Sequence, residues 1–122
     1  MTRVLVCGSR DCTDAEFVYR ALDRLSRSVM VDVVIEGDAR GVDRMAGYWA
    51  RKHKIDNWKF RAEWQRYGNA AGPIRNQRML DVGKPDLVVA FPGGVGTADM
   101  VSRAKKTNVE IIAIPSHPED TP

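Results

Sequence analysis

A glycine-rich stretch, Phe91-Pro92-Gly93-Gly94-Val95-Gly96-Thr97, lies between an apolar run and the expected start of a helix. Glycine permits positive φ and lets the backbone approach a ligand closely. A helix N-terminus adds unpaired N–H groups and a partial positive charge. A tight turn is the structural alternative, but it would need only one of the three glycines. With Thr97 as the expected N-cap, the stretch predicts phosphate binding by Pro92, Gly93, Gly94, Gly96 and Thr97.

Two further loops could face the same ligand. The loop after the first expected strand contains Gly8, Ser9 and Arg10. Its hydroxyl and its guanidinium can both bind phosphate oxygens. The loop after the second expected strand contains Arg40, Gly41 and Asp43. Its glycine opens a helix and can face an anion, and Asp43 can accept hydrogen bonds from ribose hydroxyls. The alternative for Asp43 is that it stabilises the first turn of the helix.

Arg75 stands in the first turn of a helix that we expect from Pro73 to about Asp81. A positive charge there opposes the helix dipole, and a residue that breaks a local rule invites a functional interpretation. Arg78 lies three residues further on and is expected to share the face of Arg75. We therefore add Arg75, Asn76 and Arg78 to the candidate ligand-binding residues.

The elements that must position these loops alternate between strand and helix. Apolar, β-rich runs predict strands at residues 3–7, 31–35, 58–60, 87–91 and 110–114. Helical periodicity predicts four helices. The first follows a capping box that begins at Thr13, and the others begin at Val42, Pro73 and Thr97. Residues 61–72 show no period, so we expect a long loop there.

This alternation predicts an α/β fold with a parallel sheet and right-handed crossovers. We predict a Rossmann-like, doubly wound sheet of about five strands in the order 3-2-1-4-5, covered by helices on both faces in three layers. The loops after strands 1 and 4 then lie side by side at the switch point, where such sheets bind ligands.

The chain has 122 residues, which suits one domain, predicted at residues 1–115 with a loose tail at 116–122. No apolar run is long enough to span a bilayer, and the N-terminal run is too short for a signal peptide. The two cysteines, Cys7 and Cys12, have no metal-type spacing, so we expect no metal site, a buried apolar role for Cys7 and a cytoplasmic location.

The net charge of +3 is unevenly distributed. Residues 51–78 contain eight basic and two acidic residues, which suggests an anionic partner. A solvated helix face plus a basic loop is the alternative. The aromatic residues Trp58, Phe60, Trp64 and Tyr67 alternate with these basic residues, as in proteins that stack the bases of single strands. We favour the alternative that two or three of these aromatic rings belong to the core.

Four segments together resemble the SLOG superfamily, and most closely its YspA/YpsA-related branch. They are Cys7-Gly8-Ser9-Arg10-Asp11, Gly37-Asp38-Ala39-Arg40-Gly41-Val42-Asp43-Arg44, Gly72-Pro73-Ile74-Arg75-Asn76-Gln77-Arg78-Met79 and Pro92-Gly93-Gly94-Val95-Gly96-Thr97-Ala98-Asp99-Met100. The resemblance implies a Rossmann-like fold, binding of a nucleotide or nucleotide-derived small molecule, no cofactor and a homo-oligomer.

Two better understood relatives imply different activities. The Lonely Guy phosphoribohydrolases cleave the N-glycosidic bond of nucleoside monophosphates, and their pattern Pro-Gly-Gly-x-Gly-Thr-x-x-Glu is similar to the stretch from Pro92. The position of its Glu is occupied here by Met100, so the candidate catalytic residues would be Arg75 and Asp99. The DNA-processing protein A family, which binds single-stranded DNA, shares the Gly-Ser-Arg turn and the Ala-x-Gly-x-Asp stretch.

These observations rank three hypotheses. The first is a nucleotide-binding module on the loops after strands 1 and 4, acting as a sensor or in sequestration. The second is an N-glycosidic hydrolase, and the third is a binder of single-stranded nucleic acid.

Overall fold

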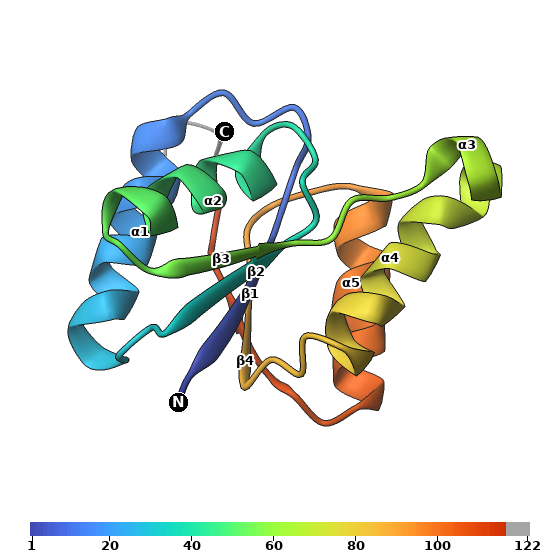
Figure 1. Ribbon diagram of the computed structural model, residues 1–122. Helices are drawn as coiled ribbons and strands as arrows, with labels where there is room; N and C mark the ends of the chain where they lie inside the picture. The colour runs from blue at the N-terminus through green and yellow to red at the C-terminus, as the bar shows by residue number, and fades with distance from the viewer. Residues whose placement is uncertain (117–122) are drawn as a thin grey trace.

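In the computed structural model, which describes residues 1–116, five parallel strands form one sheet in the order β3-β2-β1-β4-β5 (Figure 1). The strands are β1 (Arg3–Cys7), β2 (Val33–Glu36), β3 (Asp56–Lys59), β4 (Leu87–Ala90) and β5 (Glu110–Ala113). The α-helices are α1 (Ala15–Ser28), α2 (Val42–Lys52), α3 (Trp64–Tyr67), α4 (Ala71–Asp81) and α5 (Val95–Lys106). The predicted doubly wound, Rossmann-like order is confirmed.

Helices cover both faces of the sheet and give three layers. Helices α1 and α2 pack on one face and α4 and α5 on the other (Figure 1). Alternate residues of β1 supply both cores, since Val4 and Val6 face α1 and α2, whereas Leu5 and Cys7 face α4 and α5. Because β1 is buried on both faces of the sheet from Val4 to Cys7, these residues must all be apolar, which explains the continuous apolar run in the sequence.

The register of the sheet places the functional loops at one edge. In the parallel ladders Cys7 is opposite Ala90 and Leu5 is opposite Ile35. Strands β1, β2 and β4 therefore end close to the same level, and the loops that follow them leave from the carboxyl edge of the sheet, as in other open α/β sheets.

Three helices, α1, α4 and α5, begin at residues other than those predicted, and α4 begins at Ala71 and not at Pro73. Helix α1 is capped by Asp14 and not by Thr13, because the Asp14 carboxylate accepts a hydrogen bond from the Phe17 amide at 3.1 Å. Helix α5 begins at Val95 with Gly94 as its N-cap. Thr97 is therefore the third helical residue, and its side chain packs against Gly93.

Residues 61–72 are not the predicted long loop. They contain the four-residue helix α3 and a 3-10 turn, Gly68–Ala70, which leads directly into α4 (Figure 1). Helix α3 buries none of its residues and is too short to show a period in the sequence. Because α4 begins at Ala71, Arg75 lies in its second turn, and the predicted conflict with the helix dipole does not arise.

Several simpler expectations have a definite outcome. Cys7 is buried, and burial raises the pKa of its thiol to about 12, so the predicted apolar role is confirmed. Trp58 and Phe60 pack against the core on the α4 and α5 face, as predicted for part of the aromatic set. None of the helices in residues 1–116 is long and apolar enough to cross a membrane. Residues 117–122 of the predicted tail lie outside the described residues.

We predict that Gly41→Ala strongly destabilises the fold. Gly41 has φ +79°, and a Cβ atom there would collide with the carbonyl oxygen of Ser9 and lie 2.8 Å from the carbonyl carbon of Arg10. Left-handed backbone and overpacking together should lower the free energy of unfolding by about 2–4 kcal/mol. Urea unfolding measures this loss.

Gly96→Ala is the matched control for this change. Gly96 lies in α5, and the position that a Cβ atom would take there has no other atom within 4 Å, so alanine should stabilise by up to about 1 kcal/mol. Equal unfolding midpoints for Gly41→Ala and the parent protein would contradict the prediction.

Candidate functional site

Backbone hydrogen bonds join the three predicted loops at the carboxyl edge of the sheet. The Ser9 amide donates to the carbonyl of Pro92 at 3.0 Å, and the Ser9 carbonyl accepts from the Val42 amide at 3.1 Å. The loop after β1 is thus bonded to the loop after β4 on one side and to the start of α2 on the other. Side chains would obstruct this approach, since a Cβ on Gly8 would lie 2.6 Å from Val42 Cγ2.

The joined loops surround a cavity of about 830 Å³, a volume typical of small-ligand sites. The predicted residues that line it are Gly8, Ser9, Arg10, Arg40, Asp43, Arg75, Asn76, Gly94, Gly96, Thr97 and Asp99. A Cβ atom on Gly94 or Gly96 would meet nothing within 4 Å. The N-terminus of α5 therefore opens into free space on the cavity side.

Four predicted residues do not line this cavity. Arg78 is exposed, and its guanidinium lies 5.6 Å from the centre of the Phe60 ring, away from the cavity. Gly41 lies behind the cavity wall and supports the Ser9 turn. Pro92 and Gly93 lie on the other side of the glycine-rich loop.

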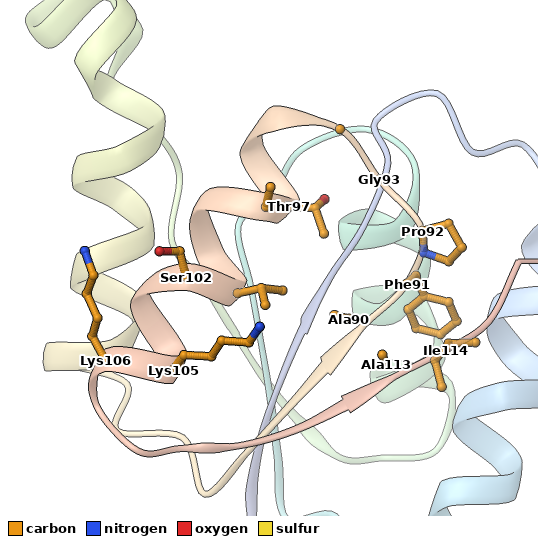
Figure 2. Close-up of a pocket in the computed structure, with 13 residues that line it drawn as sticks. Ala90, Phe91, Pro92, Gly93, Thr97, Ser102, Lys105, Lys106, Ala113 and Ile114 are labelled. Atoms are coloured by element: carbon orange, nitrogen blue, oxygen red, sulfur yellow. The ribbon is translucent and has the colours of Figure 1, made fainter.

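A second cavity of about 680 Å³ contains Pro92 and Gly93 and lies between α5 and the edge strand β5. Figure 2 shows Phe91 and Ile114 at one end of this cavity and Lys105 at the other. Its walls are largely apolar, and no carboxylate of residues 1–116 lines it. The second cavity therefore lacks the mixture of charged groups found in the first.

Arg75 reaches from α4 toward the loop after β2. Its Nη1 donates to the carbonyl of Gly37 at 2.6 Å, and its Nε donates to Asn76 Oδ1 at 2.9 Å. Among the described residues no carboxylate forms an ion pair with Arg75. Burial lowers the pKa of its guanidinium and the positive charge of Arg10 acts in the same direction, although Asp43 and Glu36 oppose the shift. Two guanidinium groups thus share the cavity without a bound carboxylate.

Asp43 lies opposite Arg75 at the start of α2 and is only 7% exposed. A side chain on Gly37 would lie 2.5 Å from Arg75 Nη1 and 2.8 Å from Asp43 Oδ2, so the two charged groups flank this glycine. Burial, reinforced by the Glu36 carboxylate, raises the pKa of Asp43 to about 7, although Arg75 and the backbone amides of Ala39 and Gly37 oppose the shift.

The arginines at the mouth of the cavity are ion-paired, whereas Arg10 and Arg75 form no ion pair within residues 1–116. Arg40 pairs with Asp11 at 3.3 Å. Arg44 and Arg61 both pair with Asp38, at 3.6 Å and 3.2 Å. These pairs are exposed on the arginine side, and each is worth little energy, but they neutralise much of the charge at the mouth.

The candidate acid Asp99 is held inside a network of hydrogen bonds. Its Oδ2 accepts from Asn76 Nδ2 at 3.0 Å and from Arg103 Nε at 2.9 Å. Burial opposes ionisation, but these hydrogen bonds outweigh it and lower the pKa of Asp99. Met100, at the position where Lonely Guy enzymes have Glu, is 1% exposed and belongs to the core.

Two residues at or beside the cavity lie outside the predicted ligand-binding set. Glu36 is fully buried at the end of β2, where its carboxylate accepts from the Asp38 amide at 2.6 Å and from Asn57 Nδ2 at 3.2 Å. Only its place at the end of an apolar run could have signalled this. Trp64 of α3 is 51% exposed and forms part of the cavity wall.

The eight basic residues of segment 51–78 do not form one surface. Arg61 and Arg75 line the cavity. Arg51 and Lys52 lie at the far end of α2, whose 11 residues extend about 16 Å from the cavity. The segment is therefore divided between two ends of the molecule.

We predict that the free energy of unfolding falls as pH rises from about 4 to about 7. A carboxyl in the unfolded chain titrates near pH 4, whereas Asp43 in the folded protein titrates near 7, so the folded state binds more protons in this window. In Asp43→Asn the free energy of unfolding should decrease less over this pH range. Burial also raises the pKa of Glu36, which should account for the decrease that remains.

Urea unfolding at half-unit steps from pH 4 to pH 8 measures this dependence. Asp56→Asn, which removes an exposed carboxylate from β3, is the matched control. An identical pH dependence in Asp43→Asn and the parent would mean that Asp43 ionises freely in the folded protein.

Two solved structures share this fold at low sequence identity. DNA processing protein A from Streptococcus pneumoniae superposes with a TM-score of 0.76 at 20% identity, over 98% of this chain and 52% of that protein. The chain therefore spans about half the length of that structure. DNA processing protein A from Helicobacter pylori, whose structure addresses its single-stranded DNA binding mode, gives a TM-score of 0.73 at 14% identity, over 98% of this chain and 68% of its own.

Sequence comparison gives a nearer relationship. The Gene 61 protein of Mycobacterium phage D29 is 38% identical over 120 residues, which cover 92% of this chain and 95% of the phage protein. Residues 2–67, more than half of the chain, match the profile of a single family that includes YspA and is related to cpYpsA. This match and the phage relative show that the chain belongs to the YspA, cpYpsA-related SLOG family.

Proposed function

We propose that the chain binds a phosphate-bearing nucleotide or nucleotide-derived small molecule in the cavity at the carboxyl edge of the sheet. One observation carries the proposal: Arg10 and Arg75, neither of them ion-paired among the described residues, share this cavity with the open N-terminus of α5. Uncompensated positive charge beside a helix N-terminus favours an anion. The family to which the chain belongs is consistent with a nucleotide ligand.

In this proposal the phosphate lies over Gly94, Gly96 and Thr97, where the first amides of α5 are unpaired. Arg10 and Arg75 supply the countercharge. The rest of the ligand extends toward the mouth, where the exposed ring of Trp64 offers a surface for a base.

The two other hypotheses have less support. For hydrolysis of an N-glycosidic bond, Asp99 would have to leave Arg103 and Asn76, and Met100 cannot replace a carboxylate. Binding of single-stranded DNA is favoured by the likeness to DNA processing protein A. Against it, the basic residues are divided between the cavity and the far end of α2, and the arginines of the mouth are already paired.

A nucleoside mono- or diphosphate, or an ADP-ribose-like compound, should raise the melting temperature. At about 100-fold over Kd the added stability is about 2.7 kcal/mol, or roughly 10 °C for a domain of this size. Arg75→Gln and Gly94→Val should each abolish the shift. Valine fits the free protein, since position 94 has open space, but it fills the space above the helix N-terminus.

Lys52→Gln, which removes one exposed charge at the far end of α2, is the control and should keep the shift. A flat melting temperature across a broad nucleotide panel at millimolar concentration would refute the proposed function. Normal binding by Gly94→Val would mean that the ligand lies elsewhere.

Single-stranded oligonucleotides should bind weakly and with a shallow dependence on salt. The slope should correspond to fewer than about three phosphate contacts at −0.7 per contact, because only part of the basic segment reaches the cavity. Trp64→Ala should change this binding little. A steep slope, together with a loss of about 1–3 kcal/mol on removal of Trp64, would instead support a strand-binding module.

A further inference from the structure

One carboxylate in the cavity differs from the others in its partners. Asp11, Asp38, Asp43 and Asp99 all line the cavity. Asp11, Asp38 and Asp99 each form an ion pair with at least one arginine. Among the residues that the structure describes, Asp43 pairs with no basic side chain, although it is the most deeply buried of the four. An unpaired buried carboxylate needs another hydrogen-bond donor.

The neighbours of Asp43 do not use all the hydrogen-bond acceptor capacity of its carboxylate. Among the described residues its donors are backbone amides: Oδ2 accepts a long hydrogen bond of 3.3 Å from the Ala39 amide, and the Gly37 amide also donates to the carboxylate. Its charged and titratable neighbours are Cys7 from β1, Glu36 from β2 and Arg75 from α4. Glu36 disfavours the charge of Asp43, Cys7 is a neutral thiol, and Arg75 donates to the carbonyl of Gly37. The carboxylate is thus left with acceptor capacity on the cavity side.

This acceptor restricts the class of ligand. Sulfate has no group to donate and would be repelled by a carboxylate in the same cavity. Inorganic phosphate offers only its own P–OH group and has no sugar to span the cavity. A ligand with both an anionic group and hydroxyl donors satisfies both sides of the site. Strands β2 and β4 are separated by β1, so their ends lie about 10 Å apart. A phosphate at α5 and the sugar that carries it can bridge this separation.

We propose that Asp43 is a specificity-determining residue that accepts hydrogen bonds from the sugar hydroxyls of the ligand, so that the cavity selects ribonucleotides over anions without a hydroxyl donor, such as sulfate, and over nucleotides without ribose hydroxyls. The proposal rests on the proposed function and adds a substrate class to it. It also separates this site from one for single-stranded DNA, which has no 2′-hydroxyl and whose internal 3′-oxygens are esterified.

The first test compares matched ligands by isothermal titration calorimetry at pH 8, where the Asp43 carboxyl is largely ionised. The probes are the four ribonucleoside 5′-monophosphates, their 2′,3′-dideoxy counterparts and inorganic sulfate. Each ribonucleotide that binds should do so about ten- to a hundredfold more tightly than its dideoxy counterpart, the usual effect of hydrogen bonds to a charged group. The 2′-deoxy and 3′-deoxy analogues should show which hydroxyl is bound.

The second test uses Asp43→Asn, which should change the affinities for ribonucleotides and for sulfate in opposite directions. The variant should bind ribonucleotides about tenfold or more weakly, and it should bind sulfate as tightly as the parent or more tightly, because a negative charge has been removed from the cavity. Asp56→Asn is the control for a carboxylate outside the cavity. Damage to the fold would weaken both ligands together, and the melting temperature of each variant is measured in parallel.

The outcomes distinguish this inference from the proposed function. Equal affinity of the parent for ribonucleotides and dideoxynucleotides would overturn the role of Asp43 and leave nucleotide binding intact. An equal loss of ribonucleotide and sulfate affinity in Asp43→Asn would also overturn it, since the role of Asp43 would then be structural. Absence of binding by every nucleotide and by sulfate would overturn both proposals.

Discussion

The main chain of Ser9 bonds to two neighbouring loops at once, and the arrangement of the site depends on these two bonds. Its amide donates to Pro92 and its carbonyl accepts from Val42, so the loops after β4, β1 and the start of α2 have a fixed relation. Gly41 allows the close approach. Because the bonds use backbone atoms, the scaffold of the site is set by chain path and by glycine positions. The side chains that face the cavity remain available for a ligand.

Buried charged groups in the cavity destabilise the folded protein when no ligand is bound. Burial lowers the pKa of Arg75 and raises that of Asp43, so each group is held in surroundings that disfavour its ionised form. The two groups face each other across Gly37 without forming an ion pair. By contrast, Asp99 has the partners needed to stay ionised. The protein thus satisfies one carboxylate internally and leaves another for an external partner, which is typical of functional sites.

The sequence was sufficient to predict the sheet, its strand order and the meeting of the loops, because buried strands and glycine turns leave strong local signals. It was insufficient where the outcome depends on tertiary contacts. Helix α3 has only four residues and no buried face, so no period could reveal it. Arg78 was placed in the site by spacing along a helix, but its contact with Phe60 directs it elsewhere. The burial of Glu36 follows from the packing of α2 and β3 around it, which no local pattern encodes.

The weak attachment of α3 has a consequence for the rates of exchange at the site. This helix projects beyond α4 (Figure 1). It contributes Trp64 to the wall of the cavity, whereas the buried residues Cys7 of β1 and Asp43 of α2 form its floor. A segment with no buried residue opens locally at a small free-energy cost, whereas the floor opens only with the whole domain. A ligand can therefore enter and leave quickly at a rate governed by the wall, while the equilibrium affinity is governed by the floor. Substitutions in α3 that leave Trp64 in place would then change residence time and on-rate in opposite directions and leave their product nearly constant.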